Sequence, residues 1–457
     1  MQIIHHGARV GVTGSCHELR LGAYGFLVDC GLFQGEEANG LLEIDFPIKH
    51  IQALLLTHSH IDHVGRLPWL LVAGFRGPIY ATEATAALLP LMLEDGLKTF
   101  LGFNKLQCER FTQIVKGLIK PIPYDCRAQL ILPDGELVSF CFRPAGHILG
   151  SAYIELTLPD NQVVVFSGDL GPSRTPLLVD PVSPKSVDTL IIESTYGDHC
   201  HLSVGDRELQ LEKVIERSLK DGGSILIPAF SVGRTQELLF DIENIIAKVI
   251  PERFGGTSAD LCWKRIPVIL DSPLAIEITQ QYLMFQRLWA KEAKVRLSYG
   301  RHPLSFQQCI TVNQHSDHVA LVNRLKVTGE AAIIVTASGM CSGGRIMNYL
   351  GALLPDNRTD VILVGYQAKG TLGRNLLSNL KHVEINKTRV EVNAGIHSMS
   401  GYSAHADQAD LLNFVAGIEC GPKQIRIVHG DLSAQEALAK KLGEIKPECE
   451  IIVAAKE

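Results

Sequence analysis

One six-residue stretch of the chain carries three imidazoles and a carboxylate, and it directly follows an apolar segment. The stretch is His58-Ser59-His60-Ile61-Asp62-His63, and residues 51–57 before it have the composition of a buried strand. Side chains alternate at the end of a strand, so His58 and His60 point to one side and are able to hold one metal ion. The neighbouring Asp62 and His63 are available to a second ion. The spacing therefore predicts a site for two metal ions at the end of a buried strand.

Length, charge and cysteine usage narrow the class of protein. A chain of 457 residues exceeds one ordinary hydrophobic core, so we expect two domains or one domain with a large insertion. The formal net charge of −6 gives no general attraction to nucleic acid, and a polyanion would need a local basic cleft. The 11 cysteines are scattered without a C-x-x-C pair, as is typical of reduced thiols in a cytosol. No export signal or membrane span is visible, so we expect a cytoplasmic protein with no membrane partner.

The pattern of apolar segments changes twice along the chain. Residues 1–198 contain short apolar runs that end in small or polar residues, with helical patterns between them. Residues 199–378 repeat a strand, loop and helix order that is typical of a parallel sheet with crossover helices. Residues 379–457 again have a strand-like pattern, followed by loops that contain histidine. The simplest architecture is a metal-binding domain, formed by 1–198 and 379–457, that an α/β domain interrupts.

A site for two metal ions needs more ligands than residues 58–63 supply. His147 lies in a glycine-flanked turn, and Asp169 and His429 each follow an apolar run. Nitrogen and oxygen donors without thiolate favour zinc, with manganese as the weaker alternative. We assign one metal to His58, His60 and His147, the other to Asp62, His63 and His429, and the bridging position to Asp169. Asp29, at the end of its own apolar run, is the expected carboxylate that holds a ligand histidine or loop in place.

The order of these residues resembles a known family. Asp29, the His-x-His-x-Asp-His stretch, His147 and Asp169 resemble the metallo-β-lactamase fold, a sandwich of two sheets between helices. Residues 193–197, 401–407 and 428–431 resemble motifs A, B and C of the β-CASP nucleases. The resemblance covers nearly the whole chain and implies an α/β protein, a metallo-β-lactamase αββα sandwich with an inserted β-CASP domain around a parallel sheet. Glu193 in motif A and His429 in motif C are similar to the RNA-directed branch, which includes the pre-mRNA 3′-end endonuclease subunit and bacterial and archaeal RNA-processing enzymes.

The resemblance also implies a function. It is that of a ribonuclease with two zinc ions per chain, which hydrolyses RNA phosphodiester bonds as an endonuclease, a 5′–3′ exonuclease or both. Asp62 and Asp169 are then catalytic together with Glu193 and His405, a pair in which the carboxylate fixes the imidazole that protonates the leaving 3′-oxygen. From the residues by themselves, Glu193 is equally an N-cap or ion-pair partner, and His405 a hydrogen-bonded loop histidine.

Loops at 231–234, 336–345 and 370–374 each join a strand to a helix and end in arginine. Free backbone N–H groups and the positive end of a helix favour an anion there. We therefore predict that the RNA backbone contacts these loops and motif B, through Ser231, Arg234, Ser338, Gly339, Arg345, Arg374 and Ser403. Glycine-rich turns are common in α/β proteins, so plain loop geometry stays the alternative. Residues 314–318, which include His315 and His318, have no second donor set nearby in sequence and are expected to form a solvated helix start.

Three other functions stay open. A DNA-directed nuclease of the same family is disfavoured by His429. A small-molecule metallo-hydrolase needs no insertion as long as residues 199–378, and an inactive scaffold would have lost ligands. The sequence is compatible with a homodimer and with partners in a processing complex, and it does not identify the RNA target.

Overall fold

A computed structural model of the chain describes residues 1–38, 42–201, 204–252, 263, 265–365, 367 and 370–456. Contacts between Cα atoms divide the chain into two compact units. Unit 1 comprises residues 1–200 and 405–457, and unit 2 comprises residues 201–404. We describe each unit by itself.

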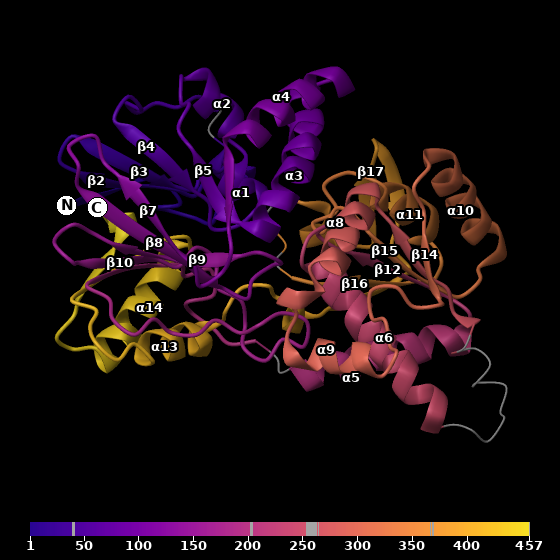
Figure 1. The fold of residues 1–457 in the computed structure, drawn as a ribbon. Helices are drawn as coiled ribbons and strands as arrows, with labels where there is room; N and C mark the ends of the chain where they lie inside the picture. The colour runs from indigo at the N-terminus through magenta and orange to yellow at the C-terminus, as the bar shows by residue number, and fades with distance from the viewer. Residues whose placement is uncertain are drawn as a thin grey trace. The chain divides into compact units, whose positions relative to one another are not determined.

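Two sheets form the centre of unit 1 (Figure 1). The first has the order β1-β2-β3-β4-β5-β6, with β1 (Gln2–Gly7), β2 (Cys16–Leu21), β3 (Tyr24–Val28), β4 (Ile51–Leu55), β5 (Ile79–Thr82) and β6 (Ile119–Ile122). The second has the order β21-β20-β11-β10-β9-β8-β7, with β7 (Arg127–Ile131), β8 (Leu137–Pro144), β9 (Ala152–Thr157), β10 (Val163–Phe166), β11 (Thr189–Ile192), β20 (Gln424–Ile427) and β21 (Glu450–Val453). In each sheet an antiparallel part continues into a parallel part, β3 to β6 in the first and β10, β11, β20 and β21 in the second.

Three apolar layers hold unit 1 together. Side chains from both sheets, among them Phe26, Phe140 and Phe166, form the inner layer. The outer face of the first sheet packs on α1 (Ile61–Val64), α2 (Leu67–Val72), α3 (Glu83–Leu101) and α4 (Lys105–Leu118). The outer face of the second sheet packs on α13 (Gln408–Ala416) and α14 (Leu432–Ile445). Unit 1 is therefore an αββα sandwich, as the sequence predicts.

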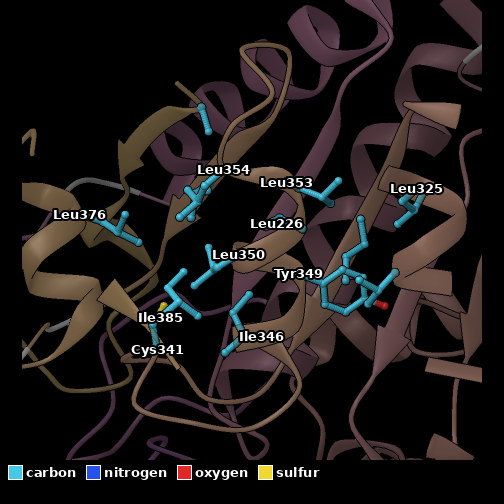
Figure 2. Packing of buried hydrophobic residues seen from close by; sticks show 14 of the residues in the cluster. Leu226, Leu325, Cys341, Ile346, Tyr349, Leu350, Leu353, Leu354, Leu376 and Ile385 are labelled. Carbon is cyan, nitrogen blue, oxygen red and sulfur yellow. The ribbon is translucent and has the colours of Figure 1, made fainter. Parts of the chain in front are cut away.

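Unit 2 is built on a parallel sheet of the order β14-β13-β15-β12-β16-β19. Its strands are β12 (Ser224–Pro228), β13 (Val268–Asp271), β14 (Cys309–Thr311), β15 (Ala332–Thr336), β16 (Asp360–Leu363) and β19 (Gly395–Ser398). Its helices include α5 (Val204–Asp221), α6 (Arg234–Glu252), α8 (Pro273–Met284), α9 (Lys291–Ser298), α10 (His315–Thr328), α11 (Ile346–Leu353) and α12 (Leu372–Leu377), and β17 (His382–Ile385) pairs with β18 (Thr388–Glu391) as a hairpin. Figure 2 shows the apolar face of α11, with Ile346, Leu350 and Leu353, in the core that also contains Leu226 and Leu325.

The chain returns to unit 1 later than residue 379, the boundary that the strand-like sequence pattern predicts. β19 pairs in parallel with β16, so residues 395–398 belong to the sheet of unit 2. Val383, Ile385 and Val390 of the β17–β18 hairpin lie in the same apolar core as α11. Contacts therefore place the return at residue 405, whereas the first crossing, between 200 and 201, lies close to the expected 198. None of the helices that the structure describes is long and apolar enough to cross a bilayer.

Candidate metal centre

Strand ends in unit 1 bring the predicted ligands to one edge of the sandwich. His58 follows β4, and Asp169, Glu193 and His429 follow β10, β11 and β20. Because β10, β11 and β20 are parallel neighbours in register, the three residues that follow them emerge at the same edge of the sheet. His147 comes from the loop between β8 and β9.

Backbone conformation at this edge is unusual. Asp29 and His429 adopt positive φ angles of 61° and 51°, a region that costs a non-glycine residue of order 1–3 kcal/mol. Gly168 has a φ of 51°, and a Cβ there would lie 2.6 Å from Cβ of Thr57. Glycine therefore allows the loop that carries Asp169 to approach the loop after β4.

The first group of ligand atoms belongs to His58, His60, His147 and Asp169, and all four atoms lie within 4.8 Å of one another. Nδ1 of His60 is 3.0 Å from Nε2 of His58 and 3.0 Å from Nε2 of His147. Oδ2 of Asp169 is 3.5 Å from Nε2 of His58 and from that of His147.

The second group belongs to Asp62, His63, Asp169 and His429. Nε2 of His63 lies 3.3 Å from Oδ1 of Asp169 and 3.8 Å from Oδ2 of Asp62. Nε2 of His429 lies 3.7 Å from the same two carboxylate oxygens. Asp169 therefore directs one oxygen into each group.

These distances fit metal coordination. Zinc–nitrogen bonds of about 2.0–2.1 Å in a tetrahedron put ligand atoms about 3.3–3.4 Å apart, which lies within the 3.0–3.8 Å spacing measured across the two groups. Moreover, Nε2 of His63, Nε2 of His429 and both carboxylate oxygens of Asp169 are buried, and no described residue forms a hydrogen bond with them. Buried polar atoms are almost always bonded, so atoms of this kind that converge on one point fit a metal ion.

The electrostatics of the two groups agree with a cation site. Burial lowers the pKa of His58 well below its usual value and that of His60 to about 4, which keeps both imidazoles in the neutral form that binds metals. Burial also lowers the pKa of His63 and His429, but nearby carboxylates outweigh it. Asp169, Asp29 and Asp62 raise the pKa of His63 well above its usual value, and Asp169 and Asp62 raise that of His429 to about 9. The carboxylates thus attract positive charge to this place.

Asp29 lies behind the second group. Its Oδ2 accepts hydrogen bonds from Nδ1 of His63 at 2.7 Å and from Oγ1 of Thr57 at 2.7 Å, and its Oδ1 accepts one from the backbone N–H of Thr57 at 2.8 Å. Asp29 therefore contacts both a ligand histidine and the loop after β4. Thr57 was not among the sequence candidates, because a threonine at the end of an apolar run gives no signal of its own.

Glu193 and His405 form a pair beside the first group. Nδ1 of His405 lies 3.1 Å from Oε2 and 3.3 Å from Oε1 of Glu193. The buried carboxylate is fixed by the backbone N–H of Leu170, which donates to Oε1 at 2.6 Å. About a fifth of the His405 side chain is exposed (19%). The ligand atoms of Asp169, Glu193 and His405 also lie within 4.8 Å of one another, so a metal ligand is an alternative role for His405.

Two predictions for unit 2 need correction. The guanidinium of Arg345 donates to the carboxylate of Asp271 and to the carbonyls of Val312 and Asn313, so these hydrogen bonds are made within the fold of unit 2. Residue 315 does begin helix α10, but His318 is not solvated, since it is fully buried and its Nδ1 lies 2.6 Å from Oδ2 of Asp271. Asp271, which the sequence analysis missed, therefore anchors both side chains.

The other predicted phosphate contacts lie at the carboxyl edge of the unit 2 sheet and just after it. Ser231, Ser338 and Gly339 follow β12 and β15, and Arg374 lies in α12 after β16 with an exposed side chain. Oγ of Ser338 accepts a hydrogen bond from the backbone N–H of Ser342. Arg234 and Ser403 are buried, so their side chains are less accessible to a ligand.

Comparison with known proteins identifies the class and then the family. The metallo-β-lactamase superfamily model matches residues 10–223, the Beta-Casp domain matches 235–376, and the Zn-dependent metallo-hydrolase RNA specificity domain matches 389–452. Fold and site thus define a metal-dependent hydrolase of the metallo-β-lactamase superfamily. Ribonuclease TTHA0252 of Thermus thermophilus is 34% identical over 447 residues, which cover 97% of this chain and 96% of that protein. The chain therefore belongs to the β-CASP ribonuclease family.

Longer relatives and a solved structure extend the comparison. Transcription termination factor FttA of Methanosarcina mazei is 30% identical over 95% of this chain and 68% of its own length. The factor of the same name in Methanocaldococcus jannaschii is 30% identical over 89% of this chain and 63% of its own length. A solved protein of unknown function from Enterococcus faecalis has a TM-score of 0.52 at 14% identity and covers 98% of this chain and 97% of that one, which supports the fold only.

Proposed function

We propose that the protein is a zinc-dependent ribonuclease that hydrolyses RNA phosphodiester bonds. The observation that carries this proposal is the convergence of two groups of ligand atoms on the two oxygens of Asp169. We assign two zinc ions to these groups, one bound by His58, His60 and His147 and the other by Asp62, His63 and His429, with Asp169 as the bridge. Two zinc ions would activate water for attack and neutralise charge on the reacting phosphate.

Several side chains of this site then act directly in catalysis. Asp62 and Asp169 would hold the metal ions and set the negative charge of the site. Glu193 accepts a hydrogen bond from Nδ1 of His405 and stabilises the imidazolium, which would give a proton through Nε2 to the leaving 3′-oxygen. Nearly all of Glu193 is buried, so its charge acts on His405 with little screening.

RNA is the substrate that the domain composition favours. Residues 389–452 match an RNA specificity domain, and the relative with nearly full coverage is named a ribonuclease. We propose that Ser231, Ser338, Gly339 and Arg374 contact the RNA backbone, because ligands of α/β sheets bind outside the carboxyl ends of the strands. The ten cysteines that the structure describes are free thiols, which supports work in the cytoplasm, as a single chain, a homodimer or part of a processing complex.

The test measures zinc content and RNA cleavage in the same preparations. After purification with zinc present, we expect two zinc ions per chain and cleavage of RNA, with end-mapped products from 5′-phosphorylated and 5′-triphosphorylated substrates that separate internal from 5′-end attack. Asp62→Ala should lose one zinc ion and almost all cleavage. Asp134→Ala is the matched control, since Asp134 is an exposed carboxylate in the turn between β7 and β8.

Each alternative has its own outcome. Equal cleavage of DNA of the same sequence would favour the DNA-directed nuclease, and hydrolysis of thioesters or lactones without RNA cleavage would favour the small-molecule hydrolase. A fully zinc-loaded protein that cleaves none of these substrates would favour the scaffold. One zinc ion or none in the wild type would refute the dinuclear site.

A further inference from the structure

Two histidines of the first sheet of unit 1 have no part in the proposed chemistry. His17 begins the pairing of β2 with β3 and is buried, and His5 lies opposite it on β1. Their Nδ1 atoms are 2.9 Å apart, a hydrogen bond between two imidazoles.

The pair connects to the metal centre through two further side chains. Nε2 of His17 is 3.4 Å from Oγ of Ser15, and that oxygen is 3.4 Å from Oδ2 of Asp29. The same carboxylate oxygen accepts the 2.7 Å hydrogen bond from Nδ1 of His63. A continuous chain thus runs from His5 through His17, Ser15 and Asp29 to His63.

Hydrogen-bond chemistry fixes the direction of this chain. A carboxylate only accepts, so Nδ1 of His63 and the hydroxyl of Ser15 both donate to Asp29. Having used its hydrogen, Ser15 accepts from Nε2 of His17. A neutral His17 then has a bare Nδ1, which accepts from Nδ1 of His5. Nε2 of His5 is left as a bare acceptor, and this buried atom indeed has no hydrogen-bond partner within the described part of the chain.

A small cavity adjoins the two long contacts. Ser15, His17, Asp29, His63 and Asp169 are among the residues that line it, and it offers about 10 Å³ to the centre of a water molecule. That is room for about one water. A water at this place would bridge the same groups, whereas the direction given above is that of the direct contacts.

We propose that His17 is a positioning residue of the metal centre, which acts through Ser15 and Asp29 to keep the proton of His63 on Nδ1 and its Nε2 directed at the metal. The inference rests on the proposed metal at His63 and adds a new residue to its support. Outer hydrogen-bond partners orient ligand histidines and commonly change metal affinity by about 10- to 100-fold. His17 is two steps further from the metal than Asp29, so we expect the lower end of this range.

The experiment compares zinc release from variants of the full, zinc-loaded protein. His17→Phe removes both nitrogens but keeps a ring that stacks on Phe166, and Ser15→Ala breaks the next step with little change in volume. His6→Phe is the matched control, because His6 also bonds a carboxylate, Glu18 at 2.9 Å, and stacks on Phe46, but its side chain has no described hydrogen bond to the residues that link His5 to His63. Zinc transfer to a chelating dye gives the rate, and the visible spectrum of the cobalt-substituted protein reports the geometry of the ligands.

His17→Phe and Ser15→Ala should each release one of the two zinc ions about 10-fold faster than the wild type and shift the cobalt spectrum, while His6→Phe behaves as the wild type. In an Asp29→Asn background, His17→Phe should add little, because the two residues act in series. Wild-type release from folded His17→Phe and Ser15→Ala, or a His17 effect that adds fully to Asp29→Asn, would overturn the inference and leave the proposed function intact. A wild-type protein without zinc would overturn both.

Discussion

Replacement of His405 by alanine separates proton donation from metal binding. His405 lies outside both groups to which we assign metal ions, and its Nδ1 is 3.1 Å from Glu193 and 3.8 Å from Asp169. Glu193 keeps its hydrogen bonds from the backbone N–H groups of Leu170 and Thr195 when the imidazole is removed. The substitution should therefore leave the seven proposed ligands in place and both zinc ions bound.

The size of the effect follows from the role. A positioned general acid contributes roughly 10²- to 10⁴-fold to the rate, so RNA cleavage should fall by that factor, or about 3–5 kcal/mol of transition-state stabilisation. A leaving group of low pKa departs without protonation. On bis-p-nitrophenyl phosphate the loss should therefore shrink to less than about 10-fold.

The assay measures zinc content, RNA cleavage and hydrolysis of the activated ester for wild type, His405→Ala and Glu193→Gln. Glu193→Gln keeps the shape of the side chain but removes the charge that stabilises the imidazolium, so an intermediate loss on RNA is expected. Equal losses on RNA and on the ester would refute the general-acid role. Loss of a zinc ion from His405→Ala would show instead that Asp169, Glu193 and His405 bind a metal.

Three further predictions concern RNA binding and stability. Arg374→Ala should weaken RNA binding and reduce the slope of log affinity against log salt by about 0.7, the value for one phosphate of a single strand, whereas folded Arg345→Ala should keep the wild-type slope; the reverse result would restore Arg345 to the RNA site. Tyr349→Phe removes a hydrogen bond to the buried Asp271 carboxylate and should lower the free energy of unfolding, measured by urea denaturation, by about 1.5–3 kcal/mol. The hydroxyl of Tyr153 donates to the neutral carbonyl of Val182, so Tyr153→Phe should lower it by about 1 kcal/mol. Burial, with the charges of Arg426 and Arg9, lowers the pKa of His5 to about 4, so the contribution of neutral His5 to stability is complete above pH 6.5 and is lost as the pH falls towards 4. Between pH 7.5 and 4, the free energy of unfolding of metal-free His5→Phe should therefore fall by about 3 kcal/mol less than that of the metal-free wild type. Equal losses would contradict the assignment.

The edge of the sandwich was predictable because its signals are local. An apolar run that ends in a polar residue marks where a buried strand delivers a side chain, and parallel neighbours deliver theirs to the same edge. Asp169 and His429 both follow such runs, although 260 positions separate them, and the structure brings them to 3.7 Å. Which of their atoms face each other, and which metal ion each side chain would bind, depends on three-dimensional geometry that the runs do not encode.

The errors arose where the partner of a residue lies far away in sequence. Arg345 ends a glycine-rich loop, and a loop of that kind is compatible with either a bound anion or an internal acid. The acid is Asp271, at the end of β13, and it also accepts from His318. No spacing within residues 314–318 or 336–345 predicts that Asp271 is their partner. The boundary at 379 differs for the same reason, since the strands from 382 to 398 read alike whether they join the sheet of unit 1 or of unit 2, and only the pairing of β19 with β16 decides.

Glu193 and His405 also lie on either side of the inserted unit in the sequence. Glu193 is the first residue after β11 and precedes the insertion, which begins at residue 201, and His405 is the first residue of unit 1 after the insertion, so the pair lies on either side of it. A parallel bridge between Tyr196 and Asp407 holds the same two segments together two or three residues further on. His429 reaches the metal centre only because β20 then pairs with β11. In the folded protein the two ends of the insertion are therefore held side by side, and the residues on either side of the insertion are those to which we assign the proton transfer.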